Sequence, residues 1–457
     1  MDSFYIEDYL PLFMFAALGM LLFSGYPVAF VLGGIGLAFG FIGMYLDVFS
    51  FIQFFNIAPR IWGGISENLV LTAIPMFIFM GTMLERSGVA ADLLHSLQVL
   101  LRRVPGGLAL SVTLMGTIMA ATTGIIGASV VMITLLALPV MVQRNYNIPL
   151  ATGTIAASGT LGILIPPSIM LVIMADLLAR SVGNLFVAAV FPGLILAGLY
   201  VLFIVVVCGF RPRLAPPLPA DVGPGSRGEL AVMVLRSFVP PIFLVFLVLG
   251  SILFGWATPT EAAGVGAAGA ILLAAVNRKL SFYVLREVAE RSALTGGMLF
   301  GIFLGATCFS YVFRALGGDD IVIGTVEAMG LGSWGLLLVL MGLVFFLGFF
   351  FDWIEITLIV LPVFSPIIEL LDFGDHVDKF EVVYWFAILL AVNLQTSFLT
   401  PPFGFALFYM KGVAPPEVKI QQIYKGIVPF VIIQLIGLGL VIAFPDIALW
   451  LPRTLLN

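Results

Sequence analysis

The chain has very little charge and almost none of the residues that build catalytic or metal centres. Of its 457 residues, 10% are charged and 61% are hydrophobic, whereas about a quarter of a soluble domain is charged. So little polar surface cannot keep a chain of this size in water. The composition therefore predicts an all-α polytopic membrane protein.

Cysteine and histidine are scarce. The two cysteines, Cys208 and Cys308, lie in apolar runs, and the two histidines are His95 and His376. These positions form no Cys-x-x-Cys pair and no metal-ligand cluster, so we expect no cofactor and no enzyme active site. The net charge of −5 argues against binding to nucleic acid. The acidic N-terminus lacks the basic stretch of a cleaved signal peptide, which predicts that the first apolar run is a retained span.

Long hydrophobic segments divide the chain. About 20 apolar residues suffice to cross a bilayer. Segments of this kind lie near residues 9–25, 28–46, 69–85, 149–179, 185–208, 235–255, 259–276, 293–313, 383–410 and 427–447. Two further regions, 107–143 and 333–371, are nearly twice as long as one span and are interrupted by glycine and polar residues. This pattern favours re-entrant hairpins.

Two of the predicted spans carry the same interruption. Ser158-Gly-Thr-Leu-Gly-Ile-Leu-Ile is followed by Pro166-Pro167, and Gln395-Thr-Ser-Phe-Leu-Thr is followed by Pro401-Pro402. Proline has no N–H and cannot continue a helix, so backbone carbonyls are freed. At membrane depth such carbonyls must line a protein cavity or bind something. Paired breaks of this kind, one in each half, indicate a transporter built from repeats.

Corresponding landmarks lie at a nearly constant offset in the two halves. Pro27 and Pro259, which open spans, are 232 positions apart, and Pro166 and Pro401 are 235 apart. Chance alignment among the 27 prolines is the alternative, but the type of segment also matches at each landmark. We therefore predict a first repeat over 1–208 (hairpin 107–143, broken helix 149–179), a cytoplasmic linker over 209–230 and a second repeat over 231–457 (hairpin 333–371, broken helix 383–410).

Five spans and a hairpin per half would make the second repeat enter the membrane from the opposite side. The charges agree, because equivalent segments differ in sign. The segment after the third span of the first half carries Arg86, Arg102 and Arg103, whereas its counterpart in the second half carries Asp319, Asp320 and Glu327. The predicted loop after the second span of the second half carries Arg278, Lys279, Arg286 and Arg291. Its counterpart in the first half, residues 47–68, carries Asp47 and Glu67 with Arg60. The positive-inside rule then places the linker in the cytoplasm and both termini in the periplasm, and Arg453 is the one charge that disagrees.

The hairpins and the broken helices supply oxygen atoms at membrane depth. Thr122, Thr123 and Ser129 lie in the middle of the first hairpin, and Ser158 precedes the first break. Sodium is a hard cation that binds carbonyl and hydroxyl oxygens, whereas the N-termini of half-helices favour anions. No lysine or arginine lies in the middle of a predicted span, so dipoles, hydroxyls and bound sodium would hold an anionic substrate. The lack of a series of buried Asp, Glu or His disfavours proton coupling.

Asp352 is an acidic residue in the middle of the second hairpin. Placing it at that depth would cost roughly 2.5–3.5 kcal/mol, so it needs a role. It could cap the second helix of the hairpin, with Glu355 completing a capping box. Alternatively, it could shape a substrate or cation cavity. The candidate cavity residues are therefore Thr122, Ser129, Ser158 and Asp352.

A set of motifs resembles those of the large membrane subunit of the tripartite ATP-independent periplasmic (TRAP) transporters, over essentially the whole chain. The motifs are Gly25-Tyr-Pro-Val-Ala-Phe30, Ala73-Ile-Pro-Met-Phe77, Pro105-Gly-Gly107, Leu161-Gly-Ile-Leu-Ile-Pro-Pro-Ser168, Phe191-Pro-Gly193, Thr258-Pro-Thr-Glu-Ala-Ala263 and Leu399-Thr-Pro-Pro-Phe-Gly404. The stretch Val312-Phe-Arg-Ala-Leu-Gly-Gly-Asp-Asp320 is similar to the subgroup named for mannitol, chloroaromatic or keto acids.

The resemblance implies an elevator-type ion transporter fold of inverted repeats in the lipid bilayer of the bacterial inner membrane. It implies sodium-driven import of a small organic acid, with a small four-helix membrane subunit and a periplasmic substrate-binding protein as partners. A stand-alone sodium-coupled carboxylate transporter of the same superfamily is the alternative, and a channel or receptor fits less well.

The resemblance also implies two sodium sites. The first maps onto Thr123, Gly124, Gly162, Ile165 and Pro167, mostly through backbone carbonyls, and the second maps onto Gly348, Ser397, Thr400 and Phe403. Where relatives usually have Ser-Gly-Ser-Ser in the first hairpin, this chain has Thr123-Gly-Ile-Ile126, so two hydroxyls are missing there. Ser397, by contrast, adds an oxygen where a glycine is common.

Overall fold

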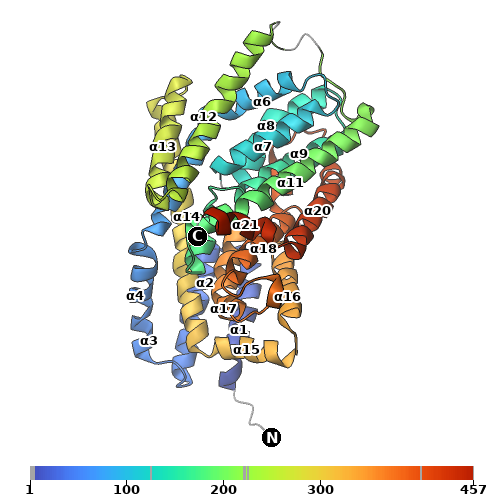
Figure 1. Ribbon diagram of the computed structural model, residues 1–457. Coiled ribbons are helices and arrows are strands. Elements are labelled where there is room, and N and C mark those ends of the chain that lie inside the picture. Colours follow the sequence, from blue (N-terminus) through green and yellow to red (C-terminus); the bar gives the residue numbers. More distant parts are fainter. Residues whose placement is uncertain (1–5, 124–125, 220–222, 224–225, 402–403, 456–457) are drawn as a thin grey trace.

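The chain folds entirely into helices in the part that the structure describes. The computed structural model describes residues 6–123, 126–219, 223, 226–401 and 404–455, and every regular element within them is helical (Figure 1). Seven helices there are long and apolar enough to cross a membrane. They are α2 (Val28–Tyr45), α8 (Ile126–Gln143), α11 (Val182–Phe210), α12 (Arg227–Leu253), α13 (Pro259–Val276), α14 (Phe282–Ala315) and α20 (Ile420–Ala443). The predicted all-α polytopic fold is confirmed.

The two halves contain the same succession of elements. In the first half, α1 (Leu10–Leu22) and α2 precede α5 (Ala73–Arg86), α6 (Val89–Leu100), the hairpin helices α7 (Gly107–Thr123) and α8, the broken helix α9 (Ile148–Thr160) and α10 (Ile169–Leu177), and α11. In the second half, α12, α13 and α14 precede α15 (Gly318–Ala328), the hairpin helices α16 (Ser333–Leu347) and α17 (Trp353–Ile368), the broken helix α18 (Val382–Ser397) and α19 (Phe405–Val413), and α20. A further helix, α21 (Asp446–Leu455), follows.

The segments predicted as loops beside the third span of each half are helical instead. Residues 51–66 form α3 (Phe51–Phe55), α4 (Ile57–Ile61) and one π turn, and they meet the following helix at a bend of 56°. The counterpart of this bent segment is α14, a single helix of 34 residues. The charged side chains in its first turns are paired: Arg286 binds Glu290 one turn away at 2.7 Å, and Glu287 binds Arg86 of α5.

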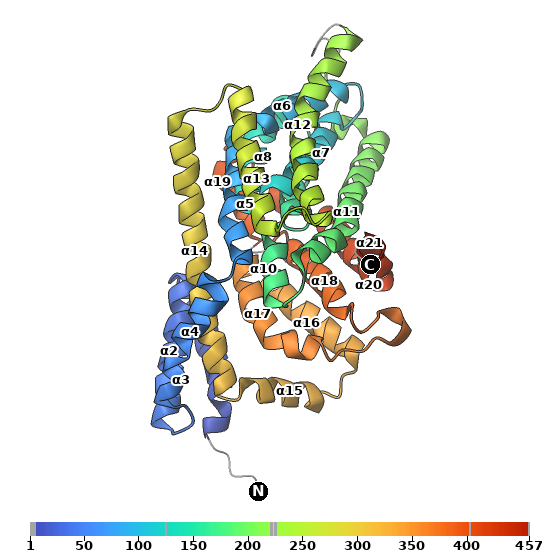
Figure 2. The same cartoon turned by 60° about the vertical axis from the view of Figure 1, so that its left-hand side comes forward.

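By their packing contacts the helices form two bodies, and Figure 2 shows α2 and α14 together at the left, apart from α16 and α18. In the first, α2 packs along α14 and α13 packs along α5, which are equivalent pairs in the two halves. Small residues allow the close approach, since a Cβ added to Gly305 of α14 would overlap the carbonyl of Ala29 on α2. In the second body, both hairpins and both broken helices pack with α11 and α20. There α9 and α20 touch through Gly153 and Gly426, where an added Cβ would meet backbone on the other helix.

The short helices α6 and α15 lie toward opposite ends of the molecule. Figure 1 places α6 near the end where α11 and α12 are joined, whereas α15 runs crosswise at the other end, beside the N-terminus. This placement is the one expected of repeats that enter a membrane from opposite sides.

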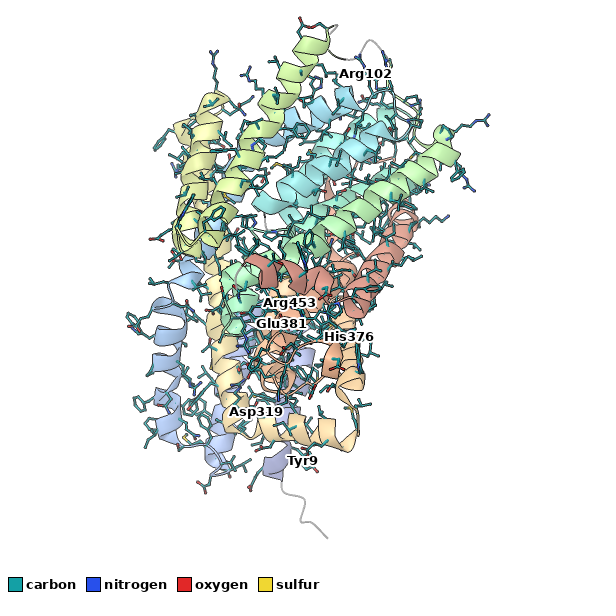
Figure 3. The ribbon with its side chains drawn as sticks, viewed as in Figure 1. Tyr9, Arg102, Asp319, His376, Glu381 and Arg453 are labelled. Atoms are coloured by element: carbon teal, nitrogen blue, oxygen red, sulfur yellow. The ribbon has the colours of Figure 1, made fainter. Side chains whose placement is uncertain are left out.

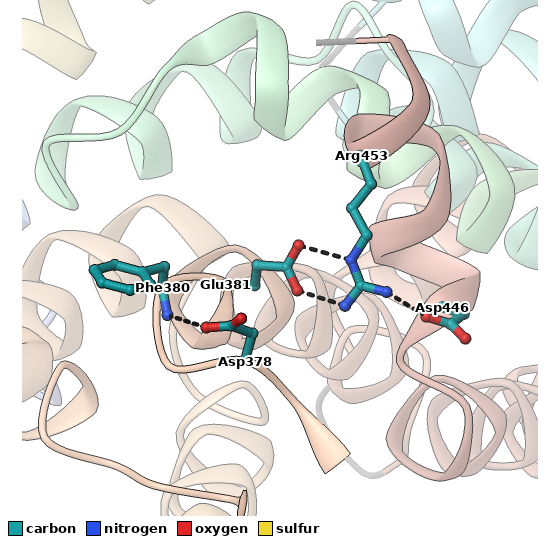
Figure 4. A network of polar contacts seen from close by, with 5 residues as sticks. All are labelled: Asp378, Phe380, Glu381, Asp446 and Arg453. Atoms are coloured by element: carbon teal, nitrogen blue, oxygen red, sulfur yellow. Dashed lines mark hydrogen bonds and ion pairs between the residues drawn. The ribbon is translucent and has the colours of Figure 1, made fainter. Parts of the chain in front are cut away.

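The C-terminal helix α21 is held to the start of α18 by an ion-pair network (Figure 4). Arg453 donates to both carboxylate oxygens of Glu381, at 2.7 and 2.5 Å, and its remaining nitrogen donates to Asp446 at 2.7 Å. Glu381 is the residue that precedes α18. The network therefore joins the end of the chain to the second broken helix.

Candidate functional site

The first helix break leaves a row of buried carbonyls. Pro166 removes the N–H that would bond to Gly162 O, and Pro167 removes the one that would bond to Ile163 O. The Ser168 hydroxyl replaces the second of these bonds by donating to Ile163 O at 2.5 Å. Within the described part of the chain, no group donates to the carbonyls of Gly162, Ile165 or Pro167. These are three of the carbonyls predicted for the first sodium site.

The second break is built from hydroxyls as well as carbonyls. Thr400 N donates to Ser397 O at 3.1 Å, which replaces the bond that Pro401 cannot make. The Ser397 hydroxyl donates to Leu394 O at 2.8 Å, and the Thr400 hydroxyl donates to Thr396 O at 2.9 Å. Each hydroxyl donates its proton to a carbonyl of its own helix, so the lone pairs of both oxygens remain available as acceptors.

The tip of the second hairpin touches this break. A Cβ added to Gly348 would overlap the Ser397 hydroxyl, so only glycine lets the two segments come this close. No described group donates to Gly348 O. The structure thus brings together Gly348, Ser397 and the adjacent Thr400, as the prediction for the second site requires. Occupation of either site by sodium stays a prediction.

Several predicted site residues lie at or beyond the limits of what the structure describes. Gly124 and Phe403 fall outside the described residues. Thr122 and Thr123 end α7, and only their backbone is described.

A buried amide connects the two breaks, and the sequence analysis missed it. Gln395 Nε2 donates to Thr160 Oγ1 at 3.3 Å, and Thr160 in turn donates to Ala157 O at 3.0 Å. Gln395 and Thr160 are both fully buried. Two residues earlier, Asn393 donates to Met341 O on the second hairpin at 2.7 Å. The available signal was the presence of two amides in an otherwise apolar membrane helix.

Asp352 caps α17. Its carboxylate accepts from Trp353 N at 2.8 Å, and Glu355 accepts from Asp352 N at 3.2 Å, so the expected capping box is present. Two other predicted cavity residues, Ser158 and Ser129, are buried: Ser158 donates to Thr113 Oγ1 at 3.4 Å, and Ser129 lies on α8. A role for these residues in binding substrate stays a prediction.

The fully buried polar side chains around the breaks are uncharged. Within the described residues they are Ser, Thr, Asn and Gln, and many of them lie on α9 and α18. Two carboxyl groups, those of Asp352 and Glu355, lie half-buried beside the tip of the second hairpin. Neutral oxygens of this kind suit a hard cation, and helix dipoles suit an anion.

Two matched halves, each with a hairpin and a proline-broken helix in the same body, define a secondary transporter. Comparison with known proteins agrees. Residues 14–447 match the family described as "Tripartite ATP-independent periplasmic transporter, DctM component". The chain therefore belongs to the DctM family, the large permeases of TRAP transporters, and is a transporter subunit rather than an enzyme.

Individual relatives cover most of the chain. It is 31% identical over 391 residues to the C4-dicarboxylate TRAP transporter large permease protein DctM of Pseudomonas aeruginosa, covering 85% of this chain and 88% of that protein. It is 27% identical over 438 residues to the sialic acid TRAP transporter large permease protein SiaM of Vibrio cholerae, covering 96% and 97%. The crystal structure of the Alcanivorax borkumensis YdaH transporter matches with a TM-score of 0.61 at 13% identity, covering 86% and 88%, which shows the fold alone.

Proposed function

We propose that this permease is the transport subunit of a sodium-coupled importer of a small organic acid. A periplasmic binding protein delivers the substrate, and a small four-helix membrane subunit completes the complex in the inner membrane. Both termini face the periplasm. The family supports the two partners, and relatives named for C4-dicarboxylates and sialic acid support an anionic cargo.

The contact between Gly348 and Ser397 carries the proposal. It brings the tip of the second hairpin against the Ser397 hydroxyl at the second break, and the Thr400 hydroxyl lies three residues further along the same break. Sodium matches such a site because it prefers hard oxygen ligands and needs no carboxylate. The free carbonyls of Gly162, Ile165 and Pro167 offer a second environment of the same kind.

The division into two bodies supports an elevator motion. The bond between Gln395 and Thr160 joins the two breaks, which supports movement of the body that holds them as a unit. The other body, built on α14 and α5, is the scaffold. Sodium and substrate would cross the membrane with the moving body.

Uptake in proteoliposomes tests the proposal. The permease, its small subunit and the binding protein loaded with its radiolabelled ligand are reconstituted, and uptake is measured with an inward sodium gradient, with an equal potassium gradient and with a proton gradient alone. We expect accumulation with the sodium gradient only. Equal uptake under all three gradients would reject sodium coupling.

The binding protein separates this proposal from the alternative. A stand-alone carboxylate transporter would accumulate free ligand from solution at the same rate without the binding protein. We expect free ligand to give no uptake above that of empty liposomes, and omission of the small subunit to abolish uptake.

A further inference from the structure

A hollow lies between the scaffold and the moving body, on the side of α15. It encloses about 230 Å³ and is bounded by α4 and α14 of the scaffold and by α10 and α17 of the moving body. Figure 2 shows these four helices side by side. The scaffold wall carries two guanidinium groups, Arg60 and Arg314, and three hydroxyls, those of Thr307, Ser310 and Tyr311.

Arg60 is held in place without being neutralised. Its guanidinium lies over the ring of Tyr311, 4.7 Å from the ring centroid, and the Tyr311 hydroxyl accepts from Asn56 at 3.3 Å. A cation over an aromatic face keeps its N–H edges free for other partners. Among the described residues, no carboxylate lies within 4.0 Å of Arg60.

Arg314 links the scaffold to the second hairpin. It donates to Pro362 O on α17. That carbonyl is free because residue 366, four positions later, is a proline with no N–H. Asp319, at the start of α15, lies 3.7 Å from Arg314 and offsets part of its charge (Figure 3). Two guanidiniums and one carboxylate leave the hollow with one net positive charge.

We propose that this pocket binds the carboxylate of an anionic substrate on its way to the hairpin tips. The inference rests on the proposed function, because it takes the anion to be the transported cargo. A planar guanidinium and clustered hydroxyls are suited to a carboxylate, with the hydroxyls donating and the arginine pairing with the charge. The pocket is a transient binding site beside the scaffold and is separate from the sites at the breaks.

The moving body supplies the apolar side of the pocket. The wall is completed by Leu177 of α10 and by Leu358 and Pro362 of α17. These apolar side chains suit the hydrocarbon part of a small organic acid. Leu358 lies six residues beyond Asp352, which is about 9 Å along a helix. A substrate held here would therefore lie within two turns of the tip of the second hairpin.

A lipid phosphate would be attracted by the same arginines. The walls of the hollow come from both bodies, so it lies between the scaffold and the moving body. For this reason we assign the site to the carboxylate of a substrate and not to a lipid headgroup. The test below contains an arm that detects a lipid headgroup instead.

Arginine-specific labelling tests the assignment directly. The full permease with its small subunit is reconstituted in phosphatidylcholine vesicles without sodium and treated with phenylglyoxal, and the modification rate of each arginine is followed by peptide mass spectrometry. Succinate serves as the carboxylate probe, and dimethyl succinate serves as its uncharged match. We expect succinate to slow the labelling of Arg60 and Arg314 together, several-fold. Arg86 and Arg286, which lie in surface ion pairs elsewhere, serve as internal controls.

Each other outcome overturns the proposal. Equal protection by both compounds, or equal protection of all four arginines, would show that succinate does not bind here as a carboxylate. Protection by added phosphatidylglycerol but not by succinate would assign the pocket to a lipid. Because no sodium is present, a failure here is distinguishable from a failure of sodium coupling.

A kinetic test uses uptake of the natural ligand by the complete complex. Arg60→Gln should raise the KM for uptake several-fold and leave the sodium dependence unchanged, whereas Arg286→Gln should behave as wild type. An unchanged KM in a folded Arg60→Gln variant would refute a role for the pocket in transport.

Discussion

The two helix breaks share a Pro-Pro pair but satisfy their backbone differently. In the first, the Ser168 hydroxyl donates to one freed carbonyl, and three other carbonyls stay open. In the second, Thr400 N donates to the carbonyl that Pro401 leaves free, and the hydroxyls of Ser397 and Thr400 add oxygen atoms at the break. The open oxygens of the first break are thus backbone carbonyls alone, whereas those of the second include side-chain hydroxyls that single mutations can remove.

The largest effect is expected where the second break meets its hairpin. Gly348→Val places methyl groups where the Ser397 hydroxyl lies, and overpacking of this kind costs about 1–3 kcal/mol. We expect sodium-driven uptake to be lost. Gly342→Val is the matched control, because nothing lies within 4 Å of a Cβ at that position. Similar uptake by the two variants would show that the Gly348 contact is not part of the site.

The hydroxyls of the second break should set its sodium affinity. In Ser397→Ala and Thr400→Ala, we expect the sodium concentration for half-maximal uptake to rise about tenfold, which corresponds to ~1.4 kcal/mol. Substrate affinity at saturating sodium should change little. If the sodium concentration for half-maximal uptake is unchanged in both variants, the second site is built from carbonyls alone, as the first is predicted to be.

The bond between the breaks should couple the two proposed sodium sites. Gln395→Leu removes the link to Thr160, so the dependence of uptake on sodium should become less steep. Asn393→Leu removes a bond to the hairpin instead and should lower the melting temperature in detergent without changing the steepness. If the two variants respond in the same way, the Gln395–Thr160 bond has only a structural role.

The smallest effect is expected at the first break. Ser168→Ala leaves Ile163 O without its donor, and a lost hydrogen bond of this kind costs about 1 kcal/mol. The melting temperature should fall by a few degrees, and half-saturation by sodium should stay that of the wild type. A clear shift in sodium affinity would mean that Ser168 contributes to the site directly.

Proline positions made much of this architecture predictable. The two Pro-Pro pairs locate both breaks, the hairpins follow from apolar regions too long for one span, and the Asp352 cap follows from the spacing to Glu355. Contacts between distant segments were not predictable. Nothing local indicates that Gln395 reaches Thr160, and the pairing of Gly348 with Ser397 was expected only from the resemblance to TRAP permeases.

Two segments with the composition of loops are helical in the structure. Residues 51–66 contain a proline, two glycines and several polar residues, and the start of α14 is rich in charge, a composition that predicts loops. At the start of α14 the charges are paired, Glu290 with Arg286 one turn away and Glu287 with Arg86 of α5.

The same two segments make the scaffold unequal. A helix of 34 residues is about 51 Å long, well beyond the roughly 30 Å of a hydrocarbon core, and α14 has no joint along it. Its counterpart is hinged by 56°. One side of the scaffold is therefore a single long helix, and the other is a bent segment. If the moving body slides along this scaffold as proposed, it meets two unlike walls, so its inward and outward resting positions would differ in energy even without substrate.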